Sequence, residues 1–406
     1  MRLFAAFCIV GLPPSTLTIY KMILTQCAVC ATELGLTSGK KCGRCSTRYC
    51  GAACQVQHWK EGGHDKICKK IKKAGGAEQY NANNKYAEAV TVAAEACAED
   101  TKGQTCYICT QAVHRHTKEG LVRMCACRGT AGFAHVSCLA EQAKILLEEA
   151  EYNNLDDKLD ERWALWDKCS LCEQGYHGVV ACALGWAAWK TYLGRPETDH
   201  TRCMAMNHLG KGLSDAGHDG YALIVKEAEL AIHRRLGAPE SYLLTVQGNI
   251  ACTLDMLGRY EEALQMKRDV HSGHVRLCGE EASITLISAN NYASCLVKLK
   301  RFEEAKALLR KTILVARRVG GNDHENTLRL RWHYAKALYE DDGATVADLR
   351  KAVETNEELE RTARRVLGGA HPATETIEHS LRESRAALRA RSVCDAMAAM
   401  TPPGDA

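Results

Sequence analysis

Apolar and small positions recur at a fixed interval of 42 residues in the carboxy-terminal half of the chain. A block of small, large apolar and aromatic positions at residues 249–263 returns at residues 291–305. Both blocks start with Asn-x-Ala and end with an aromatic residue followed by Glu-Glu-Ala. A third and weaker copy keeps Ala335, Leu338 and Ala347. A period of this length predicts stacked helical units, none of which buries its apolar face alone.

Gly237, Gly279 and Gly321 mark the boundaries of these units at the same period, and Asn207 begins a degenerate earlier copy. The order of small, large apolar, glycine and aromatic positions resembles the helix-turn-helix of a tetratricopeptide repeat. The 42-residue spacing is similar to the kinesin-light-chain type of that repeat. The resemblance implies an α-helical repeat array over residues 206–390.

Asn207, Asn249 and Asn291 share one register of the repeat. Arrays of helix pairs expose a groove suited to an extended peptide, so these amides could hydrogen-bond the backbone of a ligand. They could equally satisfy neighbouring backbone groups or water. The sequence leaves both interpretations open.

Three other stretches have helical patterns. The compact apolar run Val179–Trp189 predicts a buried helix that joins the zinc region to the first repeat. Tyr86–Cys97 predicts a helix in an Ala, Lys and Glu-rich linker without chemistry of its own, bounded by glycines. Ala140–Arg162 predicts one long charged helix.

The amino terminus carries an apolar run, Leu3–Leu12, that resembles the core of a signal peptide. At about ten residues it is shorter than the roughly twenty that a membrane span needs. No small-x-small cleavage site follows it. We expect residues 1–26 to be a non-essential or mis-assigned leader of uncertain role, in preference to secretion, membrane tethering or organelle targeting, and we expect no membrane association.

Of the 22 cysteines, fourteen fall into two clusters with the spacing of metal ligands. Paired Cys-x-x-Cys turns are how a short chain presents thiolates to zinc. The first cluster resembles the MYND zinc finger, a small interaction module. In that family the two sites interleave, which implies one zinc on Cys27, Cys30, Cys50 and Cys54 and another on Cys42, Cys45, His64 and Cys68. By the same pattern His58, beside Trp59, is not a ligand.

The second cluster has a Cys-x-Cys pair in second place and histidine as its fifth member, and it resembles the RING-CH type of RING finger. The resemblance implies one zinc on Cys106, Cys109, His135 and Cys138 and another on Cys125, Cys127, Cys169 and Cys172. Thirty residues separate the last two pairs, more than the family usually has. Because both fingers have little apolar content, we expect metal binding to supply their folding free energy.

RING fingers that act as ubiquitin ligases grip a conjugating enzyme with an apolar residue in the first zinc loop and an aromatic residue further on. Ile108 fits the first role, and Trp163 or Trp166 could fit the second. The tryptophan usual after the His-x-x-Cys pair is absent, with Gln142 near that place. A zinc scaffold without ligase activity is therefore the preferred interpretation. We expect His114 and His116 to be surface histidines.

The other eight cysteines form no Cys-x-x-Cys pair. So many free thiols beside zinc clusters indicate a reducing compartment, the cytoplasm or nucleus. Residues 21–75 carry eleven Lys or Arg against three Asp or Glu. Five of these lysines, Lys66, Lys69, Lys70, Lys72 and Lys73, fall on the helix expected to close the first finger, so a solvated face explains the charge better than nucleic-acid binding.

These patterns predict a mainly α protein with two zinc-stabilised modules, four structural Zn²⁺ ions and a tetratricopeptide-type array. We expect an intracellular adaptor that binds protein or peptide partners through the MYND finger, which takes a proline-containing peptide, and through the repeat groove. The alternative is a RING-CH-type ubiquitin ligase that uses the repeats to select substrate and also binds a conjugating enzyme. Motifs of metal-independent enzymes are missing. The expected domains are a leader at 1–26, the first finger at 27–68, a helical linker at 69–105, the second finger with its helical insert at 106–172, a connecting helix at 173–205, repeats at 206–390 and a tail at 391–406.

Overall fold

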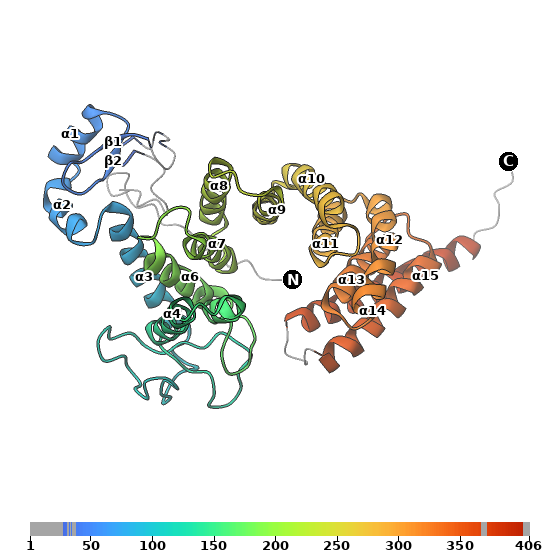
Figure 1. The fold of residues 1–406 in the computed structure, drawn as a ribbon. Coiled ribbons are helices and arrows are strands. Elements are labelled where there is room, and N and C mark those ends of the chain that lie inside the picture. The colour runs from blue at the N-terminus through green and yellow to red at the C-terminus, as the bar shows by residue number, and fades with distance from the viewer. Residues whose placement is uncertain (1–26, 31, 33, 35–37, 367–371, 401–406) are drawn as a thin grey trace. The chain divides into compact units, whose positions relative to one another are not determined.

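The computed structural model describes residues 27–30, 32, 34, 38–366 and 372–400, in two compact units, Met1–Ile232 and His233–Ala406, which are taken separately below (Figure 1). The expected leader at 1–26 lies outside the described residues. None of the described helices has the length and apolar character that a membrane span requires.

The first unit begins with a small zinc-finger fold. Two short antiparallel strands pair Lys40 with Tyr49, the first following helix packs beside the second strand, and the next helix packs on the first helix. Gly63, with φ 71°, separates the two helices in a conformation that favours glycine. The elements are β1 (Lys40–Lys41), β2 (Arg48–Tyr49), α1 (Ala52–Lys60) and α2 (His64–Lys73).

The predicted linker contains a long helix, α3 (Ala77–Ala96), that packs against the apolar helix α6 (Gly178–Tyr192). Gln79 donates a hydrogen bond to the Lys190 carbonyl at 2.9 Å. The Lys190 ammonium lies 4.0 Å from the centre of the Tyr86 ring. The segment is therefore part of a hydrophobic core and not a tether, because its small alanines allow close helix contact.

Helix α6 also packs tightly on α7 (His200–Asp215). A Cβ atom at Gly212 would lie 2.5 Å from the Ala181 carbonyl oxygen, and one at Gly185 would lie 3.0 Å from Leu209 Cα. The two backbones touch at these glycines. The prediction of a buried helix over Val179–Trp189 agrees with α6, most of whose residues are buried.

The single charged helix expected over Ala140–Arg162 is broken. Its first part is α4 (Val136–Tyr152), which ends before Asn154, a residue with φ 52°. The break turns the chain back so that Trp166 is fully buried in the core. The remaining pieces are η1 (Asp156–Lys158), α5 (Leu159–Trp163) and η2 (Ala164–Trp166).

Helix pairs make up the rest of the chain, and α8 (Asp219–Arg235) crosses the boundary between the units. The turns inside two pairs are equivalent, since Gly258 with φ 77° and Lys300 with φ 56° lie 42 residues apart. The helices of the second unit are α9 (Glu240–Met256), α10 (Tyr260–Cys278), α11 (Ser283–Lys298), α12 (Phe302–Gly320), α13 (Glu325–Tyr339), α14 (Val346–Val366) and α15 (Pro372–Met400).

The repeat register holds for the first helix of each pair and shifts in the last pair. Ala335 and Leu338 are buried as expected, but Ala347 is exposed. The turn between α13 and α14 is longer than the turns inside the two preceding pairs. The fourth residue of the second helix, Ala263 in α10 and Ala305 in α12, is therefore Leu349 in α14, and Leu349 is buried. The prediction of a mainly α fold with two cysteine-rich modules and a tetratricopeptide-type array is confirmed.

Candidate metal centres

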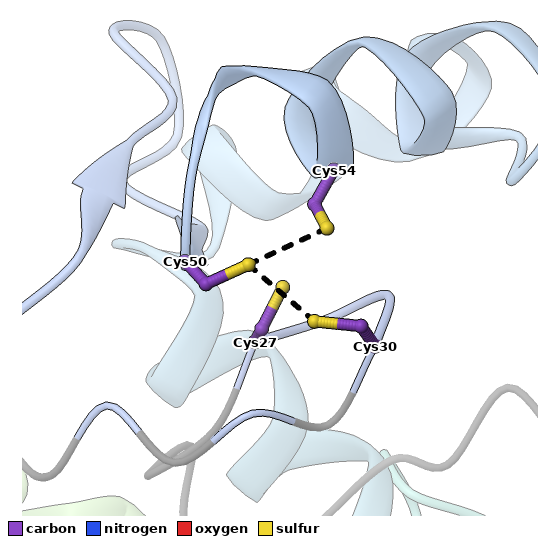
Figure 2. Close-up of side chains that lie close together, drawn as sticks. All are labelled: Cys27, Cys30, Cys50 and Cys54. Carbon is purple, nitrogen blue, oxygen red and sulfur yellow. Dashed lines mark hydrogen bonds between the residues drawn. The ribbon is translucent and has the colours of Figure 1, made fainter.

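Four cysteines from three places in the first finger converge on one point (Figure 2). Cys27 and Cys30 come from a tight turn, Cys50 follows β2, and Cys54 lies in the first turn of α1. The Cys50 sulfur lies 3.4 Å from that of Cys30 and 3.5 Å from that of Cys54. This tetrad is at the surface, where Cys30 and Cys50 are exposed.

The second tetrad of this finger, Cys42, Cys45, His64 and Cys68, is fully buried. His64 begins α2 and Cys68 follows one turn later, so both side chains lie on one face of that helix. His64 Nε2 is 3.3 Å from the Cys45 sulfur, which makes Nε2 the nitrogen that faces the centre. The two tetrads interleave along the chain.

Hydrogen bonds around the exposed tetrad shift the pKa values of its thiols in opposite directions. Hydrogen bonds from Thr32 and then from Cys50 lower the pKa of Cys30 to about 6. The hydrogen bond with Cys50 raises the pKa of Cys54 to about 12. Since only thiolates bind zinc, metal binding at this tetrad must displace protons.

His58 lies beside these centres but belongs to neither tetrad. It is buried, and its Nδ1 is 3.0 Å from the Tyr49 hydroxyl. Its ring centre is 4.9 Å from that of His64. His58 therefore contributes to the packing around the buried centre.

The second finger also forms two tetrads from alternating pairs. In the first, His135 Nδ1 is 3.3 Å from the Cys109 sulfur and 3.5 Å from the Cys138 sulfur. In the second, the Cys127 and Cys169 sulfurs are 3.7 Å apart. The four groups with all ligand atoms within 4.8 Å of one another are Cys27, Cys30, Cys50 and Cys54; Cys42, Cys45, His64 and Cys68; Cys106, Cys109, His135 and Cys138; and Cys125, Cys127, Cys169 and Cys172.

Two features that the sequence did not single out hold the second finger's loops. The Arg123 guanidinium binds the Asp100 carboxylate at 2.6 and 2.8 Å and stacks 4.2 Å from the centre of the Phe133 ring. Gly132 has φ 85°, and a Cβ there would lie 2.6 Å from Cys127 Cβ. Only glycine fits beside that ligand.

The apolar surface of the second finger differs from the expected one. Trp166 is fully buried and Trp163 packs against the same core, so neither offers an aromatic grip to a partner. Ile108 is 36% exposed, as its expected role requires, and Leu171 in the last zinc loop is 52% exposed. The Tyr107 hydroxyl, 3.1 Å from the Ser170 hydroxyl, ties these two loops together.

The remaining histidines of this finger lie in the loop before Glu119. His116 is exposed, whereas His114 is half-buried, and its Nδ1 lies 2.7 Å from the Thr117 hydroxyl. Glu119 accepts a hydrogen bond from the Ser137 backbone N–H at 2.7 Å. It thereby caps the start of α4 next to His135.

The three register asparagines have different surroundings. Asn207 donates to the Glu229 carboxylate at 3.2 Å, so it satisfies a neighbour. Asn249 and Asn291 line one hollow between α9, α10 and α11. Among the described residues, the Asn249 side chain has no hydrogen-bond partner, and Asn291 only accepts from Asn290.

The donor sets fit zinc. Each tetrad offers either four cysteines or three cysteines and one histidine, the sets of structural tetrahedral zinc sites. Protein side chains fill all four positions, so no position remains for a substrate. The four groups suit four structural Zn²⁺ ions.

Comparisons with protein families identify the modules. Family models match a MYND finger at residues 27–68, a RING-variant domain at 106–153 and tetratricopeptide repeats at 243–281 and 284–347. The chain thus carries a MYND finger, a RING-variant domain and tetratricopeptide repeats. A search of curated proteins gave no match.

Comparison with solved structures also finds chains similar to this one. The TPR-like repeats of Podosopora anserina, described as those of a kinesin light chain, are 18% identical, with TM-score 0.36, 57% of this chain covered and 97% of that chain. BtubC from P. vanneervenii is 13% identical, with TM-score 0.37, 67% of this chain covered and 95% of that chain.

Proposed function

We propose that the chain is an adaptor that binds peptide segments of partner proteins at two places, the MYND finger and the repeat groove. The sixteen tetrad residues hold four structural zinc ions that take no part in catalysis. The observation that carries the proposal is the pair of Asn249 and Asn291, whose amides line a hollow in one register. Amides spaced by one repeat can hydrogen-bond the backbone of an extended peptide.

The first finger has an apolar surface of its own. Val56 and Trp59 lie one turn apart on α1, and they are 50% and 42% exposed. The Trp59 ring packs 5.8 Å from the ring of ligand His64, which limits its movement. An aromatic ring of restricted mobility, Trp59, with the aliphatic Val56 beside it, is suited to contact a proline-containing segment.

The reducing cytoplasm or nucleus is the compartment we propose. The fourteen cysteines of the tetrads must stay as thiolates to bind zinc, and oxidation would destroy the centres. Imaging of a fluorescent fusion should place the protein in one of these compartments. Secretion of the mature chain would contradict this assignment.

The adaptor function can be tested with random peptides displayed on phage and selected on the full zinc-loaded chain. Selected peptides should fall into two groups. Asn249→Ala with Asn291→Ala should weaken one group at least tenfold, and Trp59→Ala should weaken the other while all four zinc ions remain. Gln265→Ala is the matched control, since that exposed amide on α10 bonds Asp269 outside the hollow. Absence of selected peptides, or binding unchanged in all variants, would refute the adaptor function.

A ubiquitin-ligase activity is the second candidate, because two linked zinc loops expose Ile108 and Leu171. If this surface grips a conjugating enzyme, Ile108→Ala should abolish ubiquitin transfer in vitro without loss of zinc. Cys109→Ser should abolish transfer by loss of a metal site. On the adaptor interpretation the wild type transfers no ubiquitin with any conjugating enzyme of a panel.

A further inference from the structure

The hollow that contains Asn249 and Asn291 has a histidine in its wall. His274 comes from α10 and is 2% exposed, and it lines the hollow together with Gly248 and Ser288. Neither of its ring nitrogens has a hydrogen-bond partner among the described residues. Buried polar groups are almost always hydrogen-bonded, and an unpaired one costs free energy.

The fold does not need an imidazole at this position. The equivalent residues 42 positions before and after are Ile232 and Ala316, and both are buried. Aliphatic side chains therefore fill the same place in the neighbouring repeats. His274 introduces an unpaired polar group where an apolar residue would pack without penalty.

The size and chemistry of the hollow limit what could pair with His274. Its volume is about 60 Å³, room for about two water molecules or one small side chain. Burial lowers the pKa of His274, which keeps the ring neutral near pH 7, with one N–H donor and one acceptor nitrogen. The nearby Lys267 ammonium is already paired with the Asp255 carboxylate at 2.9 Å.

We infer that the hollow is an anchor site for one small uncharged polar side chain of the bound peptide, serine, threonine or asparagine, and that His274 recognises it. Hydroxyl and amide groups both donate and accept, so either can pair with the ring nitrogen that faces the hollow whether that nitrogen is the donor or the acceptor, whereas a carboxylate can pair only with the N–H. The Asn249 and Asn291 amides would hold the peptide backbone on either side of this anchor. The inference rests on the proposed peptide-binding function and adds its side-chain preference.

The test uses the peptides whose binding to the full chain depends on Asn249. They should share serine, threonine or asparagine at one position, and alanine at that position should weaken binding to the wild type about tenfold. In His274→Leu, the serine and alanine peptides should bind within about twofold of each other. The loss of the serine preference when His274 is replaced, measured as a double-mutant cycle between peptide and protein, assigns that preference to His274.

His333→Leu is the matched control, because His333 is also a buried histidine with an unpaired Nδ1 but lies on α13 and does not line this hollow. It should keep the tenfold preference. His274→Ala is the second variant, and helical content and melting temperature establish that both His274 variants are folded. Equal preference in wild type and both His274 variants, or selection of an acidic or apolar residue, would overturn the inference alone. Failure to select any Asn249-dependent peptide would overturn the groove function with it.

Discussion

The two zinc modules of this chain bury very different amounts of apolar side chain. In the MYND finger, the buried cluster consists of four ligand cysteines with Leu34, Tyr49 and Ile71. In the RING-variant module, Phe133, Leu139 and Val122 join side chains of α3 and α6 in one continuous core. The first module depends on its metals for cohesion, whereas the second is also held by the helices around it.

This difference changes what zinc does in each module. Both have little apolar sequence between their ligands, and metal binding was expected to fold both. The structure revises that expectation for the second module, because its core is completed by helices on either side in the sequence, including Val90 of α3 and Leu184 of α6. The folding free energy of a zinc finger comes mainly from metal only where no such core exists.

Zinc removal should have the largest effect and should separate the modules. Elemental analysis should find four zinc ions per chain. With a strong chelator, amide hydrogen exchange should become fast throughout residues 38–73, since the metal supplies on the order of 10 kcal/mol per structural site. Protection should persist in α4 and α6, where Leu147 and Trp186 are buried in an apolar core. Equal loss of protection in both modules would contradict the comparison.

The loops of the RING-variant module, unlike its helices, should be sensitive at single positions. In Gly132→Ala, a residue with positive φ would also place its Cβ 2.6 Å from Cys127 Cβ. We therefore expect the free energy of unfolding to fall by about 2–4 kcal/mol, and the variant to hold three zinc ions in place of four. Gly129→Ala is the control, because Gly129 also has positive φ but no atom lies within 4 Å of the added methyl. Zinc content after dialysis measures both. Identical zinc content would show that the close approach is not required.

A pair of tyrosine variants should sharpen the comparison. Tyr49→Phe leaves the buried His58 Nδ1 without a partner, which should cost about 1–3 kcal/mol in a core with few other side chains. Tyr107→Phe removes a hydrogen bond to the Ser170 hydroxyl, which water can replace at the surface, so the change should stay within about 0.5 kcal/mol. The chelator concentration at half loss of zinc reports both. A larger effect for Tyr107→Phe would reverse the proposed order.

The zinc chemistry could be predicted from the sequence because ligand pairs are local, and no pair in either finger has more than three intervening residues. The repeat array could also be predicted from its period. The burial of α3 could not be predicted, because alanines make up most of its contact face, Ala82, Ala89 and Ala93, and Tyr86 and Val90 are its larger members. Small residues are compatible with both an exposed helix and a close contact.

Residues that depend on long-range placement were also beyond sequence reasoning. Tryptophan occurs both at binding surfaces and in cores, so the sequence did not decide between these places for Trp163 and Trp166. The break after α4 buries Trp166 in the core and packs Trp163 against it. The longer turn before α14 moved the buried position from Ala347 to Leu349. His274 could have been noticed by comparing each repeat position by position, since aliphatic residues flank it at the 42-residue spacing.

A modest effect should come from Arg123, which ties the second module's zinc loop to the segment after α3. Arg123→Lys keeps the charge but loses the two-bond fork to Asp100 and the stacking on Phe133. Because Asp100 is about half exposed, Arg123→Lys should lower the free energy of unfolding by about 1 kcal/mol. This should appear as a lower melting temperature with four zinc ions retained. Asp100→Asn should have a smaller effect, since it leaves the stacking on Phe133 in place. If Arg123→Lys released zinc, the loop would depend on that one side chain, and the surrounding core would contribute less than the comparison of the two modules requires.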